Sequence, residues 1–208
     1  MNLTTICRLG GLAGVLLILA AGTASGVCPS SIGTDCSGGT AWFGLRWDGA
    51  NVAHGQSFSL SCESLLMSVE IPVFNAGAPN VGVPPMVQGD LIHCVIVDPG
   101  WTIHATATYE NPYNFGHYSM SFDFSQLNVK LPPGNYVLLA YTNVPRWTSV
   151  EFCTADYYPG GVRYVSLAGL AGPWTSSPNL DTTFRVTVAD VPTAIAPPTW
   201  GAIKALYR

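Results

Sequence analysis

Four aromatic residues stand within two positions of a proline or glycine in segments that we expect to be loops: Trp101, Tyr113, Trp147 and Trp174. A sugar ring presents apolar C–H faces, so a flat exposed ring can stack on it while nearby Asn and Asp side chains bind its hydroxyl groups. These four are therefore the predicted ligand-binding residues. The alternative is that the four rings are buried and close the ends of the fold. Other large rings fall within expected strands and are predicted to lie in the core: Trp42, Trp47, Phe122 and Phe124.

The residues that most often carry catalysis do not occur at catalytic spacings. The histidines form no H-x-x-x-H or H-E-x-x-H pair, and no G-x-S-x-G motif surrounds a serine. Two carboxylates from distant strands can still cooperate in glycoside hydrolysis, with Glu70, Asp123 and Glu151 as candidates. Each of the three is equally explained as a solvated strand position. We therefore expect a non-catalytic protein with no catalytic residues.

Metal binding has little support in the sequence. The cysteines form no C-x-x-C pair, so no zinc site is predicted. Calcium prefers oxygen ligands from loops, and the expected loops that hold Asp98, Asp156 and Asp181 offer carboxylates. No D-x-D-x-D sequence supports such a site. Structural calcium stays an alternative, and no cofactor is predicted.

The chain is poor in charge. Charged residues make up 10% of its 208 residues, and its formal net charge is −4. Nucleic-acid phosphates and anionic membranes are bound by basic surfaces. We therefore predict no nucleic-acid partner, and expect a glycan or another cell-surface component instead.

Residues 1–26 are predicted to be a cleaved secretory signal peptide, so that the exported chain begins at Val27. One positive charge at Arg8 precedes the apolar run Leu12–Ala20, and small residues follow, as such signals require. A membrane-spanning helix needs about 20 apolar residues, and this run is shorter. No transmembrane segment is therefore expected after cleavage. Lipid attachment at Cys28 is the alternative, but the residues before it lack the usual lipoprotein pattern.

The cysteines agree with export. Six are present, and removal of Cys7 with the signal leaves an odd number in a compartment where disulfides form. Cys94 lies in the apolar run Leu91–Val97 and is predicted to be a buried free thiol. The remaining cysteines are predicted to pair as a short loop and a long-range bridge: Cys28–Cys36 and Cys62–Cys153.

Short apolar runs between turn residues predict an all-β protein, an antiparallel β-sandwich of the jelly-roll kind. In Tyr118–Phe124 the apolar residues fall on every second position, so that one face of the strand is buried. Turn signals such as Asp98-Pro-Gly100 separate the runs. We divide the exported chain into a Cys-containing loop segment, 27–39, and one sandwich domain, 40–190. The expected strands are 41–47, 56–60, 65–73, 91–97, 103–109, 118–124, 136–141, 162–167 and 182–188.

Four motifs follow one another along this domain: Gln56-Ser-Phe58, Leu131-Pro-Pro-Gly-Asn-Tyr136, Tyr158-Pro-Gly-Gly161 and Asp181-Thr-Thr-Phe-Arg-Val186. In this order they resemble the jelly-roll modules of secreted bacterial proteins. The resemblance spans about Gln56 to Val188 and consists of strands and turns, without a catalytic signature. It implies an architecture like that of carbohydrate-binding domains.

The C-terminal residues are predicted to be separate from the sandwich. Prolines make residues 191–199 an extended linker. Residues 200–208, Trp-Gly-Ala-Ile-Lys-Ala-Leu-Tyr-Arg, resemble short endings of exported Gram-negative proteins that can act as sorting or attachment tags. The alternative is a frayed terminal turn.

Two functional classes follow. The first is a secreted or surface-attached, non-catalytic module that binds carbohydrate. The second is a structural or adhesive surface protein that makes protein contacts and is attached through its tail. Exposed loop tryptophans favour the first class, and buried ones favour the second.

Overall fold

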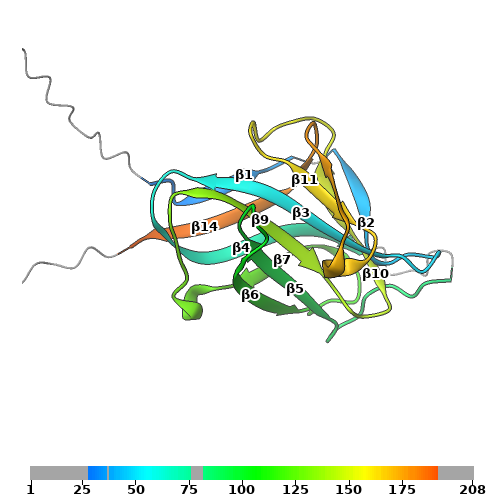
Figure 1. Cartoon of the computed structure of the whole chain (residues 1–208). Helices are drawn as coiled ribbons and strands as arrows, with labels where there is room; N and C mark the ends of the chain where they lie inside the picture. The colour runs from blue at the N-terminus through cyan, green and yellow to red at the C-terminus, as the bar shows by residue number, and fades with distance from the viewer. Residues whose placement is uncertain (1–27, 37, 76–81, 192–208) are drawn as a thin grey trace, which may run out of the picture.

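The computed structural model describes residues 28–36, 38–75 and 82–191 (Figure 1). The predicted signal peptide, the C-terminal motif at 200–208 and all of the predicted linker except Val191 lie outside these residues.

The described chain is built almost wholly of antiparallel strands, which confirms the predicted fold class. Two 3-10 turns are its helical elements, and none of its helices is long and apolar enough to cross a membrane. The first strands are β1 (Ser31–Thr34), β2 (Gly39–Leu45), β3 (Asn51–Leu60), β4 (Ser64–Asn75), β5 (Leu91–Val97), β6 (Ile103–Glu110) and β7 (Gly116–Asp123). There follow η1 (Ser125–Leu127), β8 (Lys130–Leu131), β9 (Gly134–Tyr141), β10 (Trp147–Cys153), β11 (Arg163–Ser166), η2 (Gly169–Ala171), β12 (Trp174–Ser177), β13 (Asp181–Thr182) and β14 (Phe184–Asp190).

The strand order is that of a jelly roll. One layer has the order β2-β10-β4-β7, and the other has the order β3-β9-β5-β6. Among these eight strands, the chain crosses between the layers at every step except the β5–β6 hairpin, which stays within the second layer. Two interlocked Greek keys of this kind give a two-layer sandwich.

The last strand, β14, extends the first layer. It pairs with the first half of β4, while β10 pairs with the same strand near its end. On its other side β14 pairs with β1, so the first and last described strands lie side by side (Figure 1). The prediction that residues 27–39 form a loop segment is therefore wrong. This segment has too few apolar residues for a clear alternation, yet the edge of β14 supplies backbone partners for Ser31–Thr34.

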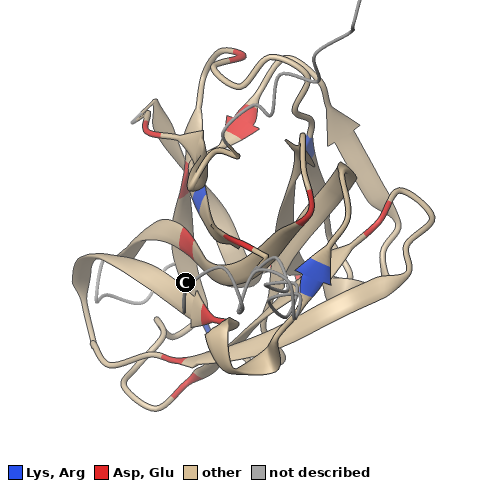
Figure 2. Cartoon of the chain, turned by 90° about the vertical axis from the view of Figure 1, so that its left-hand side faces the viewer, with Lys and Arg blue, Asp and Glu red and all other residues tan. Residues whose placement is uncertain are grey.

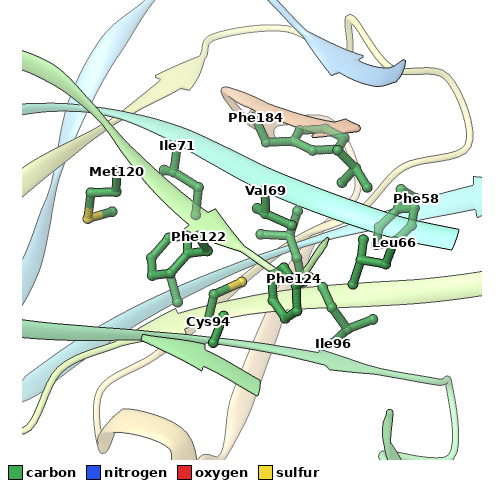
Figure 3. Close-up of a cluster of buried hydrophobic side chains, with 14 of the residues drawn as sticks. Phe58, Leu66, Val69, Ile71, Cys94, Ile96, Met120, Phe122, Phe124 and Phe184 are labelled. Atoms are coloured by element: carbon green, nitrogen blue, oxygen red, sulfur yellow. The ribbon is translucent and has the colours of Figure 1, made fainter. Parts of the chain in front are cut away.

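The core lies between the two layers. Side chains of alternating strand residues meet there, including Phe58, Ile96, Met120, Phe122 and Phe184 (Figure 3). Met120 and Phe122 are fully buried, as the alternation in β7 predicted. Each large side chain removed from water contributes about 1.5–3 kcal/mol, so this interior accounts for much of the stability of the fold.

A smaller apolar cluster lies on the outer face of the second layer. Val95, Val97, Val137 and Leu139 point away from the main core and are buried nonetheless. The hairpin of β11 and β12 covers them, with Tyr164, Leu170 and Trp174 packed against the valines and the leucine. This hairpin is also hydrogen-bonded to the edge of the sheet, because β11 pairs with β3. It thus adds a third partial layer at this place.

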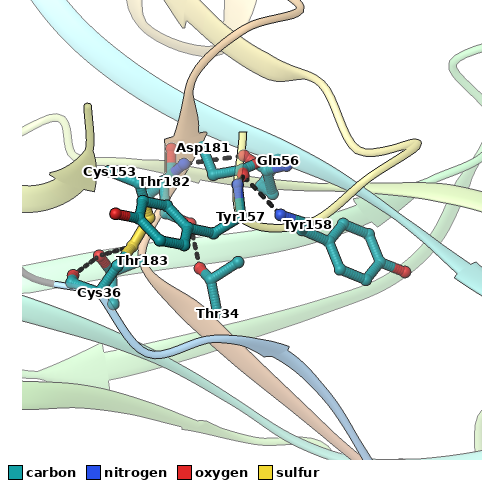
Figure 4. The surroundings of a disulfide bond; sticks show 9 residues. All are labelled: Thr34, Cys36, Gln56, Cys153, Tyr157, Tyr158, Asp181, Thr182 and Thr183. Atoms are coloured by element: carbon teal, nitrogen blue, oxygen red, sulfur yellow. Dashed lines mark hydrogen bonds between the residues drawn. A yellow bond between two sulfur atoms is a disulfide. The ribbon is translucent and has the colours of Figure 1, made fainter. Parts of the chain in front are cut away.

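The described residues contain two disulfides, with a pairing different from the predicted one. They are Cys28–Cys62, with Cα atoms 6.1 Å apart, and Cys36–Cys153, with Cα atoms 5.6 Å apart (Figure 4). Cys94 is free and buried. The predicted Cys28–Cys36 and Cys62–Cys153 bridges are wrong because register sets the partners. β1 and β4 pair with opposite edges of β14 and run parallel to each other, which brings together Cys28 before β1 and Cys62 before β4. β2 pairs with β10, which places Cys36 beside Cys153.

Candidate ligand-binding site

A cavity of about 260 Å³ opens on the outer face of β3 and β9, beside the loop that joins β5 to β6. In both strands, Phe58 and Tyr136 turn their side chains into the core. Their neighbours therefore turn to the outer face, where they form the floor of the cavity. Its lining consists of Ser57, Phe58, Ser59, Asp98, Pro99, Trp101, Asn135, Tyr136, Val137, Gly160 and Tyr164.

A tight turn at residues 98–102 presents the Trp101 ring at one side of the cavity. The Trp101 amide donates to the Asp98 carbonyl over 2.9 Å, and the Thr102 amide donates to Asp98 Oδ1 over 2.9 Å. Trp101 itself has a φ of 65°. A left-handed backbone conformation is uncommon for a bulky residue, and residues in such strained conformations are often found at binding sites. The side chain remains 46% exposed although it is large and apolar.

The Trp101 ring is supported by two rings of the β11–β12 hairpin. Its centroid lies 6.1 Å from that of Trp174, with planes inclined by 24°, so the two indoles are stacked. Tyr164 lies at 6.1 Å with planes at 82°, an edge-on contact. Such geometries suit the aromatic quadrupole. Trp174 thus lies against the Trp101 indole, which still remains partly exposed to solvent.

Polar groups surround this ring. Asp98 Oδ2 lies 3.3 Å from His104 Nε2. The Thr102 amide that bonds to the Asp98 carboxylate lowers the pKa of Asp98, with a further contribution from His104. On the floor, the Ser59 hydroxyl donates to Asn135 Oδ1 over 2.7 Å, which leaves the Nδ2 group of this amide as a donor. The cavity thus offers a carboxylate acceptor and an amide donor beside an aromatic ring.

The turn at Tyr158–Gly161 forms another wall of the cavity. It is held by the buried Asp181 carboxylate, which accepts hydrogen bonds from the Tyr157 and Tyr158 amides, each over 2.8 Å (Figure 4). Gln56 Nε2 donates to the same carboxylate over 2.8 Å. At Gly161 a Cβ atom would lie 2.4 Å from Tyr158 Cδ1, so the turn closes too tightly for a side chain there.

The structure separates the four predicted ligand-binding residues. Trp101 and Trp174 come together. Trp147 is 5% exposed and stacks on Trp42 with centroids 4.8 Å apart, so it belongs to the interior and its assignment to the site is corrected. Tyr113 is 52% exposed and contacts Tyr118, but it follows β6 whereas Trp101 precedes that strand, so the two lie at opposite ends of β6.

Sequence reasoning also missed some residues of the site. Tyr164 and the floor residues Ser57, Ser59 and Asn135 lie in or beside strands, where we looked for core positions. The alternation in Gln56–Leu60 was the available signal, because it places the two serines on the face opposite to Phe58. One residue that we predicted to lie in the core is exposed instead: Trp47, at the turn after β2, is 62% exposed.

The carboxylates considered for catalysis lie on the outer face of the other layer. Glu70 lies 3.8 Å from Arg185, and Glu151 lies 3.6 Å from His117. Asp123 accepts a hydrogen bond from the Ser125 amide. None of the three lines the cavity.

Metal ligands do not gather at the loops considered for calcium. Within the described ranges, no group of three His, Cys, Asp or Glu side chains is placed to hold a metal ion. Asp181 is buried among the hydrogen bonds described above. Charged residues are dispersed over separate strands and loops, with few Lys or Arg among them (Figure 2).

Fold and site together define a jelly-roll β-sandwich domain with an aromatic pocket on the outer face of one sheet. No known family model and no curated protein sequence matches the chain. Among solved structures, a similarity is found to the structure of the infectious bursal disease virus Gx strain, with 12% sequence identity and a TM-score of 0.29. The match covers 85% of this chain and 46% of that one, so the chain spans less than half of that structure. A similarity at this level does not define a shared function.

Proposed function

We propose that this chain is an exported, non-catalytic domain that binds glycans in the cavity beside Trp101. The observation that carries the proposal is the stacking of Trp101 on Trp174 next to Asp98 and Asn135. A ring that is supported by a stacked partner and remains partly exposed is suited to the apolar face of a sugar. The carboxylate and the amide can bind the hydroxyl groups at its edge.

We propose a non-catalytic function because of the carboxylate that lines the cavity. Glycosidases use two carboxyl groups on either side of the scissile bond. Among the described lining residues Asp98 is the one carboxylate, and its pKa is lowered. A general acid for glycoside cleavage needs a raised pKa, so Asp98 is suited to binding a sugar and unsuited to protonating a leaving group.

Export is the second part of the proposal. The N-terminal residues have the composition of a secretory signal, and the described residues hold two disulfides. Disulfides persist in oxidising compartments outside the cytosol. Glycans of cell surfaces and matrices are the ligands available there.

A glycan array probed with the exported chain, followed by calorimetric titration of the hits, tests the proposal. Trp101→Ala should lose most of the binding. Trp47→Ala is the matched control, because Trp47 is a 62% exposed tryptophan that does not line the cavity. Equal loss in both variants, or no glycan bound by the parent chain, would overturn the proposal.

A structural or adhesive role is the second candidate. Two exposed rings of the loop between β6 and β7 favour it, since Tyr113 is 52% and Phe115 is 73% exposed. Adjacent exposed aromatics of this kind mark protein contacts. If this loop mediates adhesion, the double variant Tyr113→Ser, Phe115→Ser should abolish self-association or cell attachment and leave glycan binding unchanged.

A further inference from the structure

We infer that the cavity accepts a single terminal ring of an uncharged glycan, and rejects both chain interiors and anionic sugars. This inference rests on the proposed function and specifies the class of ligand for the same site. Size, shape and charge of the cavity carry it.

The cavity is small. Its volume of about 260 Å³ lies below the range of about 300–1,000 Å³ in which pockets for drug-sized ligands fall. A space of this size fits one sugar ring stacked on Trp101 with its hydroxyl groups toward the floor. It leaves no room for two consecutive rings.

Two turns contribute to the lining of the cavity beside the strands of its floor. The turn at residues 98–102 stands on one side with Pro99 and Trp101, and the turn at Tyr158–Gly161 stands on another with Gly160. Both turns are held by hydrogen bonds to carboxylates, from Thr102 to Asp98 and from Tyr157 and Tyr158 to Asp181. A polysaccharide interior needs a groove that is open at both ends, whereas a terminal ring needs one opening.

The charge of the cavity selects among terminal rings. Of the described lining residues Asp98 is the one that is ionised at neutral pH, and no Lys or Arg lines the cavity. A sugar carboxylate or sulfate placed beside Trp101 would face a like charge in a partly enclosed space, where charges interact more strongly than in bulk water. The hydroxyl groups of a neutral ring can instead donate to the Asp98 carboxylate, which gives strong charge-assisted bonds.

Matched sugars test the charge selection in calorimetric titrations of the exported chain. Glucose and galactose are compared with glucuronate and galacturonate, which replace one hydroxymethyl group by a carboxylate. We expect each uronate to bind about tenfold more weakly or worse at low salt, a difference of about 1.4 kcal/mol, and the gap to narrow as salt is added. Asp98→Asn should close the gap, since asparagine can still accept the Thr102 amide bond. Asp48→Asn, in the turn after β2, is the control and should leave the gap unchanged.

Linear and cyclic oligosaccharides of one neutral sugar test the selection for terminal rings. We expect the linear series to bind with nearly constant affinity from the disaccharide upward, and the cyclic compound, which has no ends, not to bind. Cyclic binding as tight as linear binding, or affinity that climbs steadily with length, would overturn the inference while leaving glycan binding intact. Uronate binding equal to that of the neutral sugar in the parent chain would overturn the charge selection. Failure of every sugar to bind contradicts the proposed function itself.

Discussion

The indole of Trp101 stacks on the indole of Trp174, with ring centroids 6.1 Å apart and planes inclined by 24°. The two residues lie 73 positions apart in the chain, in a loop and in a late hairpin, and the hairpin brings them together because β11 pairs with β3. Trp174 is itself half-buried against the valines of the outer apolar cluster. The Trp101 ring, which we propose as the ligand platform, is thus fixed by a small hydrophobic cluster outside the main core.

The first prediction follows from this support. Trp174→Ala should weaken glycan binding by about 1 kcal/mol, because Trp101 loses its stacked partner and becomes mobile. Trp101→Ala should cost about 1–3 kcal/mol by direct loss of the platform. The double variant should bind no more weakly than Trp101→Ala, to within about 0.5 kcal/mol, because both substitutions act on the same platform, the Trp101 ring. Titration calorimetry of the three variants measures this, with Leu167→Ala, exposed on the same hairpin, as the control. Additive losses would contradict the supporting role of Trp174.

The second prediction separates the buried tryptophan from the exposed one. Trp147 is 5% exposed and stacked on Trp42, so Trp147→Ala should lower the free energy of unfolding by about 3–5 kcal/mol. At temperatures where the variant remains folded, its glycan affinity should equal that of the parent. Denaturant unfolding and calorimetry on the same samples test both parts. A stable Trp147→Ala variant that has lost binding would return Trp147 to the site.

The third prediction concerns the disulfides. Non-reducing peptide mapping should recover Cys28 linked to Cys62 and Cys36 linked to Cys153, with Cys94 unmodified. In native protein Cys94 should resist alkylating reagents, because burial raises the pKa of its thiol and blocks access. Replacing both Cys36 and Cys153 by serine should cost about 4–5 kcal/mol of stability, as the chain-entropy model gives for loops of this length. Rapid labelling of Cys94 before unfolding would contradict its buried position.

Local patterns in the sequence were sufficient for the class of fold. The alternation in residues 118–124 places Met120 and Phe122 in the core, and the Asp98-Pro-Gly100 turn places Trp101 in a loop. Both features depend on residues within a few positions of one another. They can therefore be derived without knowledge of the rest of the chain.

Features that depend on pairing between distant strands could not be derived. Trp147 follows a proline by two residues, like a loop residue, yet it begins β10, which is buried between β2 and β4. Cys36 meets Cys153 only because β2 pairs with β10 in one register. Tyr164 reaches the cavity because β11 pairs with β3. Each of these contacts is set by long-range register, for which one sequence carries no local signal.

The fourth prediction tests how the wall of the cavity is held. Asp181→Asn places an NH₂ group either against the Gln56 amide, which donates to Oδ1, or against the backbone amides of Tyr157 and Tyr158, which both donate to Oδ2. Gln56 cannot turn its side chain to compensate, because its Oε1 accepts the Thr182 amide bond over 2.8 Å. A buried unsatisfied donor costs about 1–3 kcal/mol of stability.

Two measurements check the effect of Asp181→Asn. Hydrogen exchange at the Tyr157 and Tyr158 amides should accelerate, and glycan binding should weaken because the turn at Gly160 loses its position. Asp156→Asn, an exposed neighbour in the same segment, is the control and should change neither. If Asp181→Asn changes neither the exchange of both amides nor the stability, the Asp181 carboxylate does not hold the turn.

The last prediction is a pH dependence that originates at His54. This ring is buried, and its Nε2 lies 2.7 Å from the Trp42 carbonyl, so Nε2 carries the proton and donates. Nδ1 lies 3.3 Å from the Arg163 guanidinium and accepts from it. Burial above all, with the charge of Arg163, lowers the pKa of His54 from 6.5 to about 4 in the folded chain. A second proton on the ring would sit at Nδ1, directly against the arginine.

Because this pKa is lower in the folded than in the unfolded chain, the unfolded chain binds more protons between the two values. Stability contributed by neutral His54 is therefore complete above pH 6.5 and is lost as the pH falls from 6.5 to about 4. The total loss is on the order of 3 kcal/mol, at 1.36 kcal/mol for each pH unit of pKa difference. Urea unfolding at a series of pH values measures the slope. His54→Gln, which keeps a donor for Trp42 and an acceptor for Arg163 but does not titrate, should flatten the curve in this window. Equal stability of the parent chain at pH 4.5 and at pH 7 would contradict the assignment of a neutral, buried His54.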